Sequence, residues 1–369
     1  MTVAVSGDSI TFPDNSVQAT APKVGMVNRI INGAMVIDQR NAGASVTPTD
    51  TDGRPYALDR WNTRLSQASK FSIQQSSTAP TGFIKSSLIT SLSAYSITSS
   101  DQFVFIQIVE GLNASDLAWG TASAATVTLS FQVRSSLTGT FGGSLRNAAA
   151  DRSYPFSYTI NAANTWETKT LTIAGDTSGT WLTTNGIGIT VGFGFGVGST
   201  LSGTAGAWAG ANYASATGAV SVVGTSGATF YITGVQLEKG STATAFDYLD
   251  YGRSLSQCQR YFIKYENSGP NSYIMAAFGV AGATTGGSAT ITLPVTMRTQ
   301  PSYSASNLCA ADTQNAVTNI TSSTIRTDVS TTSLIFIEYN VTSGLTQFRP
   351  YYVRSQPSTA ANISLSAEL

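Results

Sequence analysis

The chain has 369 residues, enough for two or three domains of ordinary size. Charged residues make up 11% of the chain, and 20 Lys and Arg balance 20 Asp and Glu, so the formal net charge is zero. We therefore expect no nucleic-acid partner, because such a partner requires a basic face that neutralises phosphates. The absence of histidine excludes Ser-His-Asp and Cys-His catalysis and removes the commonest metal ligand.

The sequence also indicates where the chain is made. No apolar run approaches the ~20 residues of a membrane helix, and the start MTVAVSGDS lacks the basic and apolar regions of a signal peptide. We expect synthesis in a cytoplasm and no membrane insertion. Cys258 and Cys309 have no CxxC context, so neither a zinc site nor a redox motif is predicted. We expect two buried free thiols, with a Cys258–Cys309 disulfide as the alternative.

Residues 1–45 are interpreted as an N-terminal β arm for attachment or assembly. A hairpin is predicted over residues 10–17, with Pro13, Asp14 and Asn15 as its turn. Strands this short are stable only against neighbours, so we expect the arm either to pack on the next domain or to pair with other copies of the chain. A further strand is predicted over residues 29–38.

Residues 46–251 show short strands separated by turn signals, which is typical of a β-sandwich and, with two Greek keys, of a jelly roll. The four tryptophans Trp61, Trp119, Trp166 and Trp181 are expected as core anchors rather than ligand contacts, because aromatic residues beside apolar strands usually fill cores. The stronger strand candidates are residues 71–75, 83–87, 103–109, 125–133, 156–160, 166–173, 187–197, 220–223 and 229–237.

The stretch 186–198, GIGITVGFGFGVG, combines a strand pattern with many glycines. Alternation places the apolar residues at odd positions from 187 to 197 on one face, and Gly188, Gly192, Gly194 and Gly196 on the other. A phosphate-cradling loop would need a helix directly after the glycines, and no helix is predicted there. We therefore expect the bare face to let another segment approach closely.

The loop 199–217, STLSGTAGAWAGANYASAT, offers Trp208, Asn212 and Tyr213 as a candidate glycan-binding surface. Sugar rings stack their C–H faces on flat aromatic groups, while Asn, Ser and backbone groups bind their hydroxyls. The alternative is structural, with Trp208 packed on another element or at a subunit interface, because interfaces are rich in aromatic residues.

Residues 229–262 are predicted to close this domain and lead into the next one. The strand 229–237 would turn Phe230, Ile232, Val235 and Leu237 inward, with a bulge at Gly234. A hinge helix is predicted from Ser254 as its N-cap, with Leu255, Cys258 and Phe262 on one face.

Residues 252–369 are predicted to hold this helix and a second, small β domain of a size that can form its own core. Its strand candidates are residues 274–279, 289–296, 324–329, 334–341, 351–353 and 363–369. The fold class that we predict is all-β, with a jelly-roll-like β-sandwich, a hinge helix, a second small β domain and a short N-terminal β arm.

Four stretches of the sequence resemble bacteriophage tail fibres and related virion adhesins. In that family a jelly-roll, carbohydrate-binding-like module ends in a GVQLE-type strand and passes into a CQRYY-type helix, with a short C-terminal β domain after it. The first stretch is GVQLEKGSTATAFDYLDYGRSLSQCQRYF, which has Phe262 in place of the last Tyr. The others are NRIINGAMVIDQRNAG, SDLAWGTASAATVTLSFQVRSSLTGTFGGSLRN and RSYPFSYTINAANTWETKTLTIAGDTSGTW.

The resemblance implies a homotrimeric tail fibre of the virion that attaches to host surface polysaccharide or lipopolysaccharide, with its N-terminal arm bound to other tail or head proteins. The first alternative is a purely structural virion appendage, on the tail or the head. A glycan depolymerase ranks third, since it would need a carboxylate pair, and we expect no enzyme. A structural Ca²⁺ is a further alternative and no other cofactor is expected. The carboxylates available for either role are Glu110, Asp116, Glu167, Glu238 and Asp247.

Overall fold

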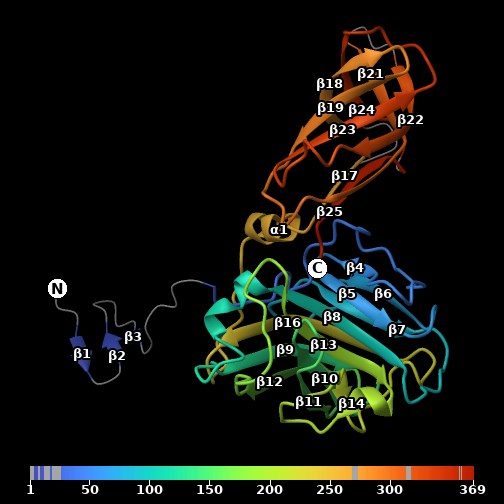
Figure 1. Ribbon diagram of the computed structural model, residues 1–369. Helices are drawn as coiled ribbons and strands as arrows, with labels where there is room; N and C mark the ends of the chain where they lie inside the picture. The colour runs from blue at the N-terminus through green and yellow to red at the C-terminus, as the bar shows by residue number, and fades with distance from the viewer. Residues whose placement is uncertain are drawn as a thin grey trace.

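The computed structural model describes three short strands between residues 4 and 18, and residues 26–267, 273–312, 317–356, 358 and 360–369. In these residues the protein is built of β-strands, one α-helix, α1 (Tyr251–Gln259), and three single-turn 3₁₀ helices. A β-sandwich and a β-barrel lie on either side of α1 (Figure 1). The predicted all-β class, with a hinge helix between two β domains, is confirmed.

The sandwich consists of two antiparallel sheets, and the chain passes repeatedly from one to the other, as in a jelly roll. The six-stranded sheet has the order β11 (Ser153–Ile160), β10 (Gly139–Arg146), β13 (Ile187–Val197), β8 (Gln102–Glu110), β5 (Trp61–Leu65), β4 (Tyr56–Leu58). The five-stranded sheet has the order β12 (Glu167–Ile173), β9 (Val127–Ser135), β16 (Thr229–Lys239), β7 (Ser86–Ser91), β6 (Phe71–Ser76).

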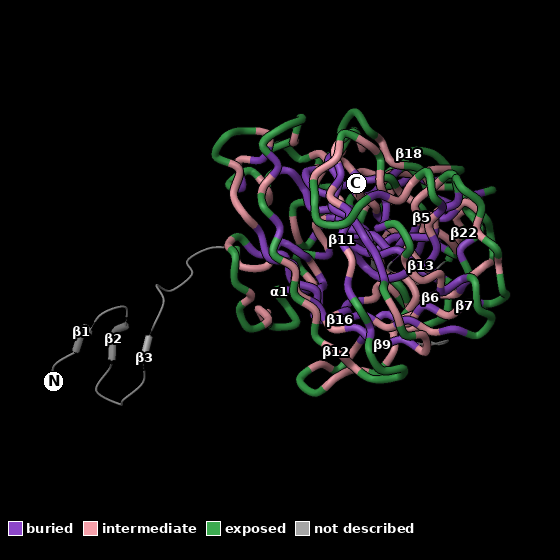
Figure 2. The backbone as a smooth tube through the Cα atoms, turned by 90° about the horizontal axis from the view of Figure 1, so that it is seen from below, coloured by how far each residue is buried: buried purple, intermediate pink, exposed green. Residues whose placement is uncertain are grey.

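Aromatic side chains fill the space between the two sheets. Trp61 stacks on Phe105 with ring centroids 4.6 Å apart, and Phe131 meets Phe193 edge to face at 5.0 Å. Figure 2 shows the buried backbone in purple running through the middle of the molecule, with exposed loops around it. Burying each large apolar side chain stabilises the fold by about 1.5–3 kcal/mol, so this core explains why the sandwich is stable.

The four tryptophans expected in the core divide into two groups. Trp61 and Trp119 are buried, and Trp181 is partly buried against the same core. Trp166 is different, because it packs edge to face on Tyr231 with centroids 6.1 Å apart and lies outside the core cluster. The expectation was wrong for Trp166, since Tyr231 alternates with the inward residues of β16 and therefore faces away from the core.

The predicted strands agree best where apolar residues alternate. The 187–197 strand has the predicted bounds, and the 229–237 strand extends to Lys239. The strand predicted over 220–223 is wrong, because these residues form a loop. Val222 and Val223 of this loop are buried in the core. The sequence pattern missed β10, in which small residues dominate the run GTFGGSLR.

The glycines of β13 meet another segment closely, as predicted. A Cβ placed on Gly194 would lie 3.2 Å from the Cβ of Ser215, so the loop 199–217 crosses the outer face of the six-stranded sheet there. The expected single apolar face is wrong at both ends. Ile187 and Val197 pack on the outer side, because register shifts after Ile187 and Gly194 reverse the alternation.

Residues 26–45 pack on the sandwich. Ile30 and Met35 belong to the sandwich core, which favours a domain boundary near residue 26 over the predicted boundary at 45, although the division into domains stays a prediction. The strand predicted over 29–38 is wrong. Asn32 and Met35 have φ of 57° and 58°, and the Asn32 side chain bonds both backbone groups of Ile37, which makes a turn instead.

The start of the chain contributes the small antiparallel sheet β1 (Ala4–Ser6), β2 (Ser9–Thr11) and β3 (Val17–Gln18). Pairing of β2 with β3 confirms the predicted hairpin, while its turn at residues 13–15 lies outside the described residues. Farther along, 3₁₀ turns occupy Gly111–Asn113, Ser115–Leu117 and Ser199–Leu201, and the two-residue strands β14 (Ser202–Gly203) and β15 (Ser215–Ala216) pair in parallel.

The hinge helix α1 begins four residues earlier than predicted. Asp250, not Ser254, is its N-cap, and the Asp250 side chain accepts a hydrogen bond from the Arg253 backbone N–H at 3.0 Å. Either residue type can satisfy a free N–H at a helix start, so local sequence left the choice open. Cys258 is buried as predicted, whereas Phe262 lies in the next strand, β17 (Phe262–Glu266).

The second domain is a closed six-stranded barrel, joined to α1 by a three-stranded sheet. Its core is made mainly of Ala, Ile, Leu and Val. The strand predicted over 324–329 is wrong beyond Ile325, where a turn begins. The barrel order is β18 (Met275–Ala283), β19 (Gly286–Thr292), β23 (Leu334–Val341), β22 (Val317–Ile325), β21 (Leu308–Ala311), β24 (Pro350–Ser355), and the small sheet is β17, β25 (Asn362–Ser366), β20 (Ser302–Ser306).

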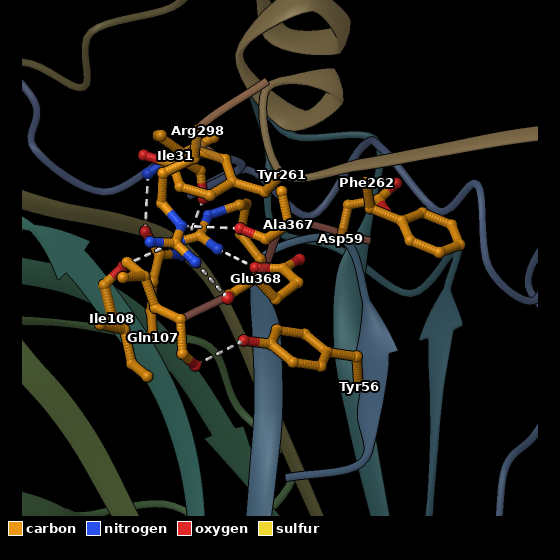
Figure 3. A network of polar contacts seen from close by, with 12 residues as sticks. Ile31, Tyr56, Asp59, Gln107, Ile108, Tyr261, Phe262, Arg298, Ala367 and Glu368 are labelled. Carbon is orange, nitrogen blue, oxygen red and sulfur yellow. Dashed lines mark hydrogen bonds and ion pairs between the residues drawn. The ribbon is translucent and has the colours of Figure 1, made fainter. Parts of the chain in front are cut away.

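A cluster of paired charges joins the barrel side of the molecule to the sandwich (Figure 3). We call Arg40, Asp59, Arg60, Tyr261 and Glu368 the junction cluster. The Glu368 carboxylate forms ion pairs with Arg60 and, at 2.7 Å, with Arg40. The Arg60 guanidinium also lies 3.6 Å from the centre of the Tyr261 ring. The last described residues are therefore held inside the junction by opposite charges.

Candidate functional site

Trp208 lies in a cluster of aromatic side chains at one end of the sandwich. Its ring centre is 5.3 Å from that of Trp119, 5.4 Å from that of Trp181 and 5.2 Å from that of Tyr154, each edge to face. Its indole N–H donates to the carbonyl of Ala174 at 2.7 Å. This packing agrees with the alternative that Trp208 packs on another element, and its contact with a glycan stays a prediction.

The other two predicted site residues make different contacts. The Asn212 side chain is exposed, and its Oδ1 accepts a hydrogen bond from Arg146 at 2.9 Å. Tyr213 covers Gly203, where an added Cβ would lie 2.3 Å from the tyrosine ring. The structure thus brings Asn212, but neither Trp208 nor Tyr213, into the lining of the charged groove described next.

The outer face of the six-stranded sheet carries a groove of about 130 Å³, which we call the arginine groove. Its floor is apolar and comes from β8, while polar side chains from β5, β10 and β13 stand around it. A small concave site with an apolar floor and a few convergent polar groups is the usual form of a small-ligand site. The lining residues are Arg54, Arg64, Gln102, Ile106, Ile108, Arg146, Asn147, Ala148, Ala150, Ile187, Thr190 and Asn212.

The strand register brings these residues together. Arg146 lies beside Thr190, which lies beside Ile108, so one row crosses β10, β13 and β8. Arg64 reaches the groove from β5, where it pairs with Val104 of β8. The alternation of WNTRL points Arg64 away from the buried Trp61, so its direction could have been predicted from the sequence. Its meeting with Arg146 could not, because that depends on pairing between distant strands.

Three arginines define the charge of the groove, and one of them, Arg54, donates to the Leu369 carbonyl oxygen at 3.0 Å. Neither Arg64 nor Arg146 forms an ion pair within the part of the chain that the structure describes, and the lining includes no Asp or Glu. Arg146 is only 8% exposed. Burial, together with repulsion from Arg64 and Arg54, lowers the pKa of Arg146 to about 10. The groove is therefore positively charged and only partly hydrated.

Free polar groups beside the arginines can bind neutral hydroxyls. Among the described residues, the side-chain amide of Gln102 and the hydroxyl of Thr190 form no hydrogen bond, and both line the groove. Ile106 and Ile108 are each 2% exposed and form its floor. The hydroxyls of a sugar could bind the amide, the hydroxyl and the guanidinium groups that stand around this floor.

Four of the five candidate carboxylates already have partners outside this groove. Glu110 binds Arg260 and Tyr261, and Glu167 binds Lys169 and the backbone of Asn161. The remaining two are Asp116, which pairs with Arg29 and Lys239, and Glu238, which accepts from Gln236 and Thr244. Asp247 lies next to a second cavity, described below.

The two cysteines lie outside any metal-binding group of the described residues. Cys258 and Cys309 are both buried free thiols, and burial raises the pKa of each. Among the described residues, no group of three or more Cys, Asp or Glu could hold a metal ion. No helix in the same residues is long and apolar enough to cross a membrane.

A second cavity, of about 300 Å³, lies between residues 28–36, the sandwich and α1. Phe83, Phe246 and Tyr248 pack against one another there, and Ile84 and Tyr251 are 73% and 64% exposed. We call these five residues the aromatic patch. Asn28 and Asn32 also line this cavity, but their amides are already bonded to the backbone. The patch therefore presents exposed aromatic and apolar side chains in one place, which is typical of a contact surface.

No family model and no curated protein matches the chain. Distant solved structures include the enzymatically active domain of bacteriophage CBA120 tailspike protein 4, with 14% identity over 58% of this chain and 22% of that one, at a TM-score of 0.31. A putative sugar binding protein from Bacteroides thetaiotaomicron has 13% identity over 58% of this chain and 100% of that one, at 0.33. The family 11 carbohydrate-binding module of Clostridium thermocellum Lic26A-Cel5E has 11% identity over 56% and 100%, at 0.27. Similarities this distant carry no inference about ligand, activity or partner.

Proposed function

We propose that this protein is a non-catalytic glycan-binding adhesin, a bacteriophage tail fibre that attaches the virion to host surface polysaccharide or lipopolysaccharide. The observation that carries glycan binding is the arginine groove, where the unbonded side-chain amide of Gln102 and hydroxyl of Thr190 lie beside guanidinium groups. The virion assignment rests on the four sequence stretches that resemble tail fibres. Engagement of Glu110, Asp116, Glu167 and Glu238 in other contacts supports binding over depolymerisation.

Filling the groove tests this proposal without removing any of its polar groups. Ala148 is exposed at the edge of the groove, so Ala148→Trp would block entry while leaving the core untouched. Ala163→Trp is the matched control, because Ala163 is exposed in the loop between β11 and β12. We expect Ala148→Trp to lose attachment to host cells and to purified lipopolysaccharide at least tenfold, and the control to retain both. Equal attachment by the two variants would exclude the groove as the receptor site.

A structural appendage is the second candidate, and the aromatic patch favours it. Ile84, Tyr248 and Tyr251 are each more than half exposed, and exposed apolar residues gathered in one place usually mark a protein interface. We infer that the patch contacts another copy in a homotrimer. The N-terminal arm, predicted over residues 1–45, attaches to another virion protein. Both candidates allow this assembly.

Light scattering tests the assembly. We expect a trimer of the 38.5 kDa chain and its dissociation in Ile84→Asp, because a charge would be buried in the interface. Val329→Asp, at an exposed residue of the barrel, is the control and should stay trimeric. A monomer at micromolar concentration in the natural chain would contradict the trimer.

A further inference from the structure

We infer that the arginine groove binds the negatively charged group, a carboxylate or a phosphate, of an acidic glycan. This inference rests on the proposed glycan binding and adds the class of glycan. A planar guanidinium can donate two parallel N–H groups to the oxygens of either anion, so arginine suits both.

Arg146 lacks a countercharge among the described residues. Its Nε is buried and has no hydrogen-bond partner among the described residues, and one of its terminal nitrogens donates only to the neutral amide of Asn212. A buried charge is normally paired, because removing it from water is unfavourable. Arg54 and Arg64 add positive charge to the same groove. An oxyanion on the ligand would supply the pairing that the chain lacks.

The other buried arginines of the described chain differ from Arg146, because they form ion pairs. Arg29 and Arg60 are 3% and 1% exposed, and each has a carboxylate partner, Asp116 for the first and Glu368 for the second. Arg146 is the third arginine in the buried class and has none. The two paired arginines contribute to the scaffold. The unpaired one lines a cavity that is open to solvent.

The groove lining also indicates whether the anionic group belongs to a saccharide or to a nucleic acid. Within its described lining the groove has no aromatic side chain on which a nucleic-acid base could stack, and the whole chain has no net positive charge. The neutral groups of Gln102 and Thr190 instead suit the hydroxyls of a sugar next to its charged substituent. The arrangement favours a saccharide over a nucleic acid.

Calorimetric titration of the full chain with matched saccharides tests the inference. The probes are trigalacturonate and its carboxyl-reduced, neutral form, and host core oligosaccharide before and after removal of its phosphates. We expect one charged member of these pairs to bind at least tenfold more tightly than its neutral counterpart, with the affinity falling as salt is added. The pair that shows the difference identifies the anion as carboxylate or phosphate.

Three variants assign the effect to the groove. Arg146→Met should reduce binding of the charged saccharide at least tenfold, and Asn212→Asp should do the same by placing a competing carboxylate beside Arg146. Arg134→Gln is the control, because Arg134 lies on β9 of the other sheet and binds the carbonyl of Asn164. It should bind like the natural chain. Melting curves of all variants establish that each is folded.

The outcomes separate this inference from the proposed function. Equal binding of the charged and neutral saccharides, unaffected by Arg146→Met, would overturn the inference and leave glycan binding intact. Arg146-dependent binding of a single-stranded DNA oligonucleotide in preference to every saccharide would also overturn it. Failure of every saccharide, together with unchanged cell attachment by Ala148→Trp, would overturn the proposed function itself.

Discussion

Arg60 and Arg64 lie close together in the sequence but belong to two groups of arginines that differ in how their charge is balanced. Arg60 precedes β5 and belongs to the junction cluster, where Glu368 and Asp59 supply negative charge. Arg64 lies within β5 and belongs to the arginine groove, whose described lining holds no carboxylate. The same short stretch thus contributes to a neutralised, structural cluster and to an unbalanced, open one. The presence or absence of a countercharge distinguishes an arginine that holds the fold from one that is available to a ligand.

The largest loss of stability is expected from a substitution in the junction cluster. Glu368→Gln would leave Arg60, which is 1% exposed, without its carboxylate, and breaking a buried pair in this way typically costs about 3–5 kcal/mol. Urea unfolding should report this loss, and small-angle scattering should report looser contact between the domains. Glu338→Gln, at an exposed residue of the barrel, is the control, with an expected change within about 0.5 kcal/mol. A loss equally small in Glu368→Gln would mean that the junction charges are not structural.

The next largest effect is expected for Trp208, which belongs to the same loop as Asn212. Trp208→Ala removes three edge-to-face ring contacts and one hydrogen bond. We expect a loss of about 3 kcal/mol in the free energy of unfolding, near the lower end for large aromatic residues because the ring is only partly buried. Unchanged melting with lost attachment to host cells would instead assign Trp208 to the glycan site.

The pH dependence of stability tests the balance of charges at the junction. Burial raises the pKa of Asp59 to about 6, although Arg40 opposes the shift. Because the folded pKa lies above the unfolded value of about 3.9, the folded state binds the proton more tightly. The resulting stability is complete below about pH 4 and is lost as the pH rises through 6.

Comparing the natural chain with Asp59→Asn isolates this contribution. We expect the stability of the natural chain, relative to the variant, to fall by about 2–3 kcal/mol between pH 4 and pH 8. Denaturant titrations at several pH values would measure it. If the free energy of unfolding changed equally with pH in the two proteins, Asp59 would not titrate in this range.

The smallest expected change is a gain in stability, and it concerns the arginine groove. Asn212→Asp would give Arg146 a carboxylate partner where it now has a neutral one. A charged pair is stronger than a hydrogen bond to an amide, so we expect a gain of about 1 kcal/mol in the free energy of unfolding. Arg146→Met should likewise be neutral or stabilising, because it removes an unpaired charge from the interior. A clear loss in both variants would make Arg146 a structural residue.

Much of the fold could be predicted because its signals are local. Alternation in 187–197 and 229–237 placed two central strands, and the glycines of the first predicted the close approach of another segment. Predictions failed where tertiary contacts overrode the pattern. The turn at Asn32 replaced a strand because its side chain bonds Ile37, and Val223 filled the core from a loop.

The candidate site was less predictable than the fold. Asn212 was predicted to bind sugar hydroxyls next to the aromatic residues of its loop, yet it lines the groove through a contact with Arg146, 66 positions away. Arg54, Arg64 and Arg146 carry no motif, and in the sequence they are ordinary charged residues of three separate segments. Their position in one cavity depends on the pairing of β5, β8, β13 and β10.

By itself, the sequence determined the all-β class, the hinge helix between two β domains and the exclusion of histidine-based catalysis, because composition and alternation are properties of short stretches. Only the tertiary structure decided which charges are paired. Glu368 reaches Arg60 from 308 positions away, while no carboxylate of the described chain reaches Arg146. Electrostatic energy depends on distance and burial, and both are set by how remote strands pack, so sequence position does not reveal them.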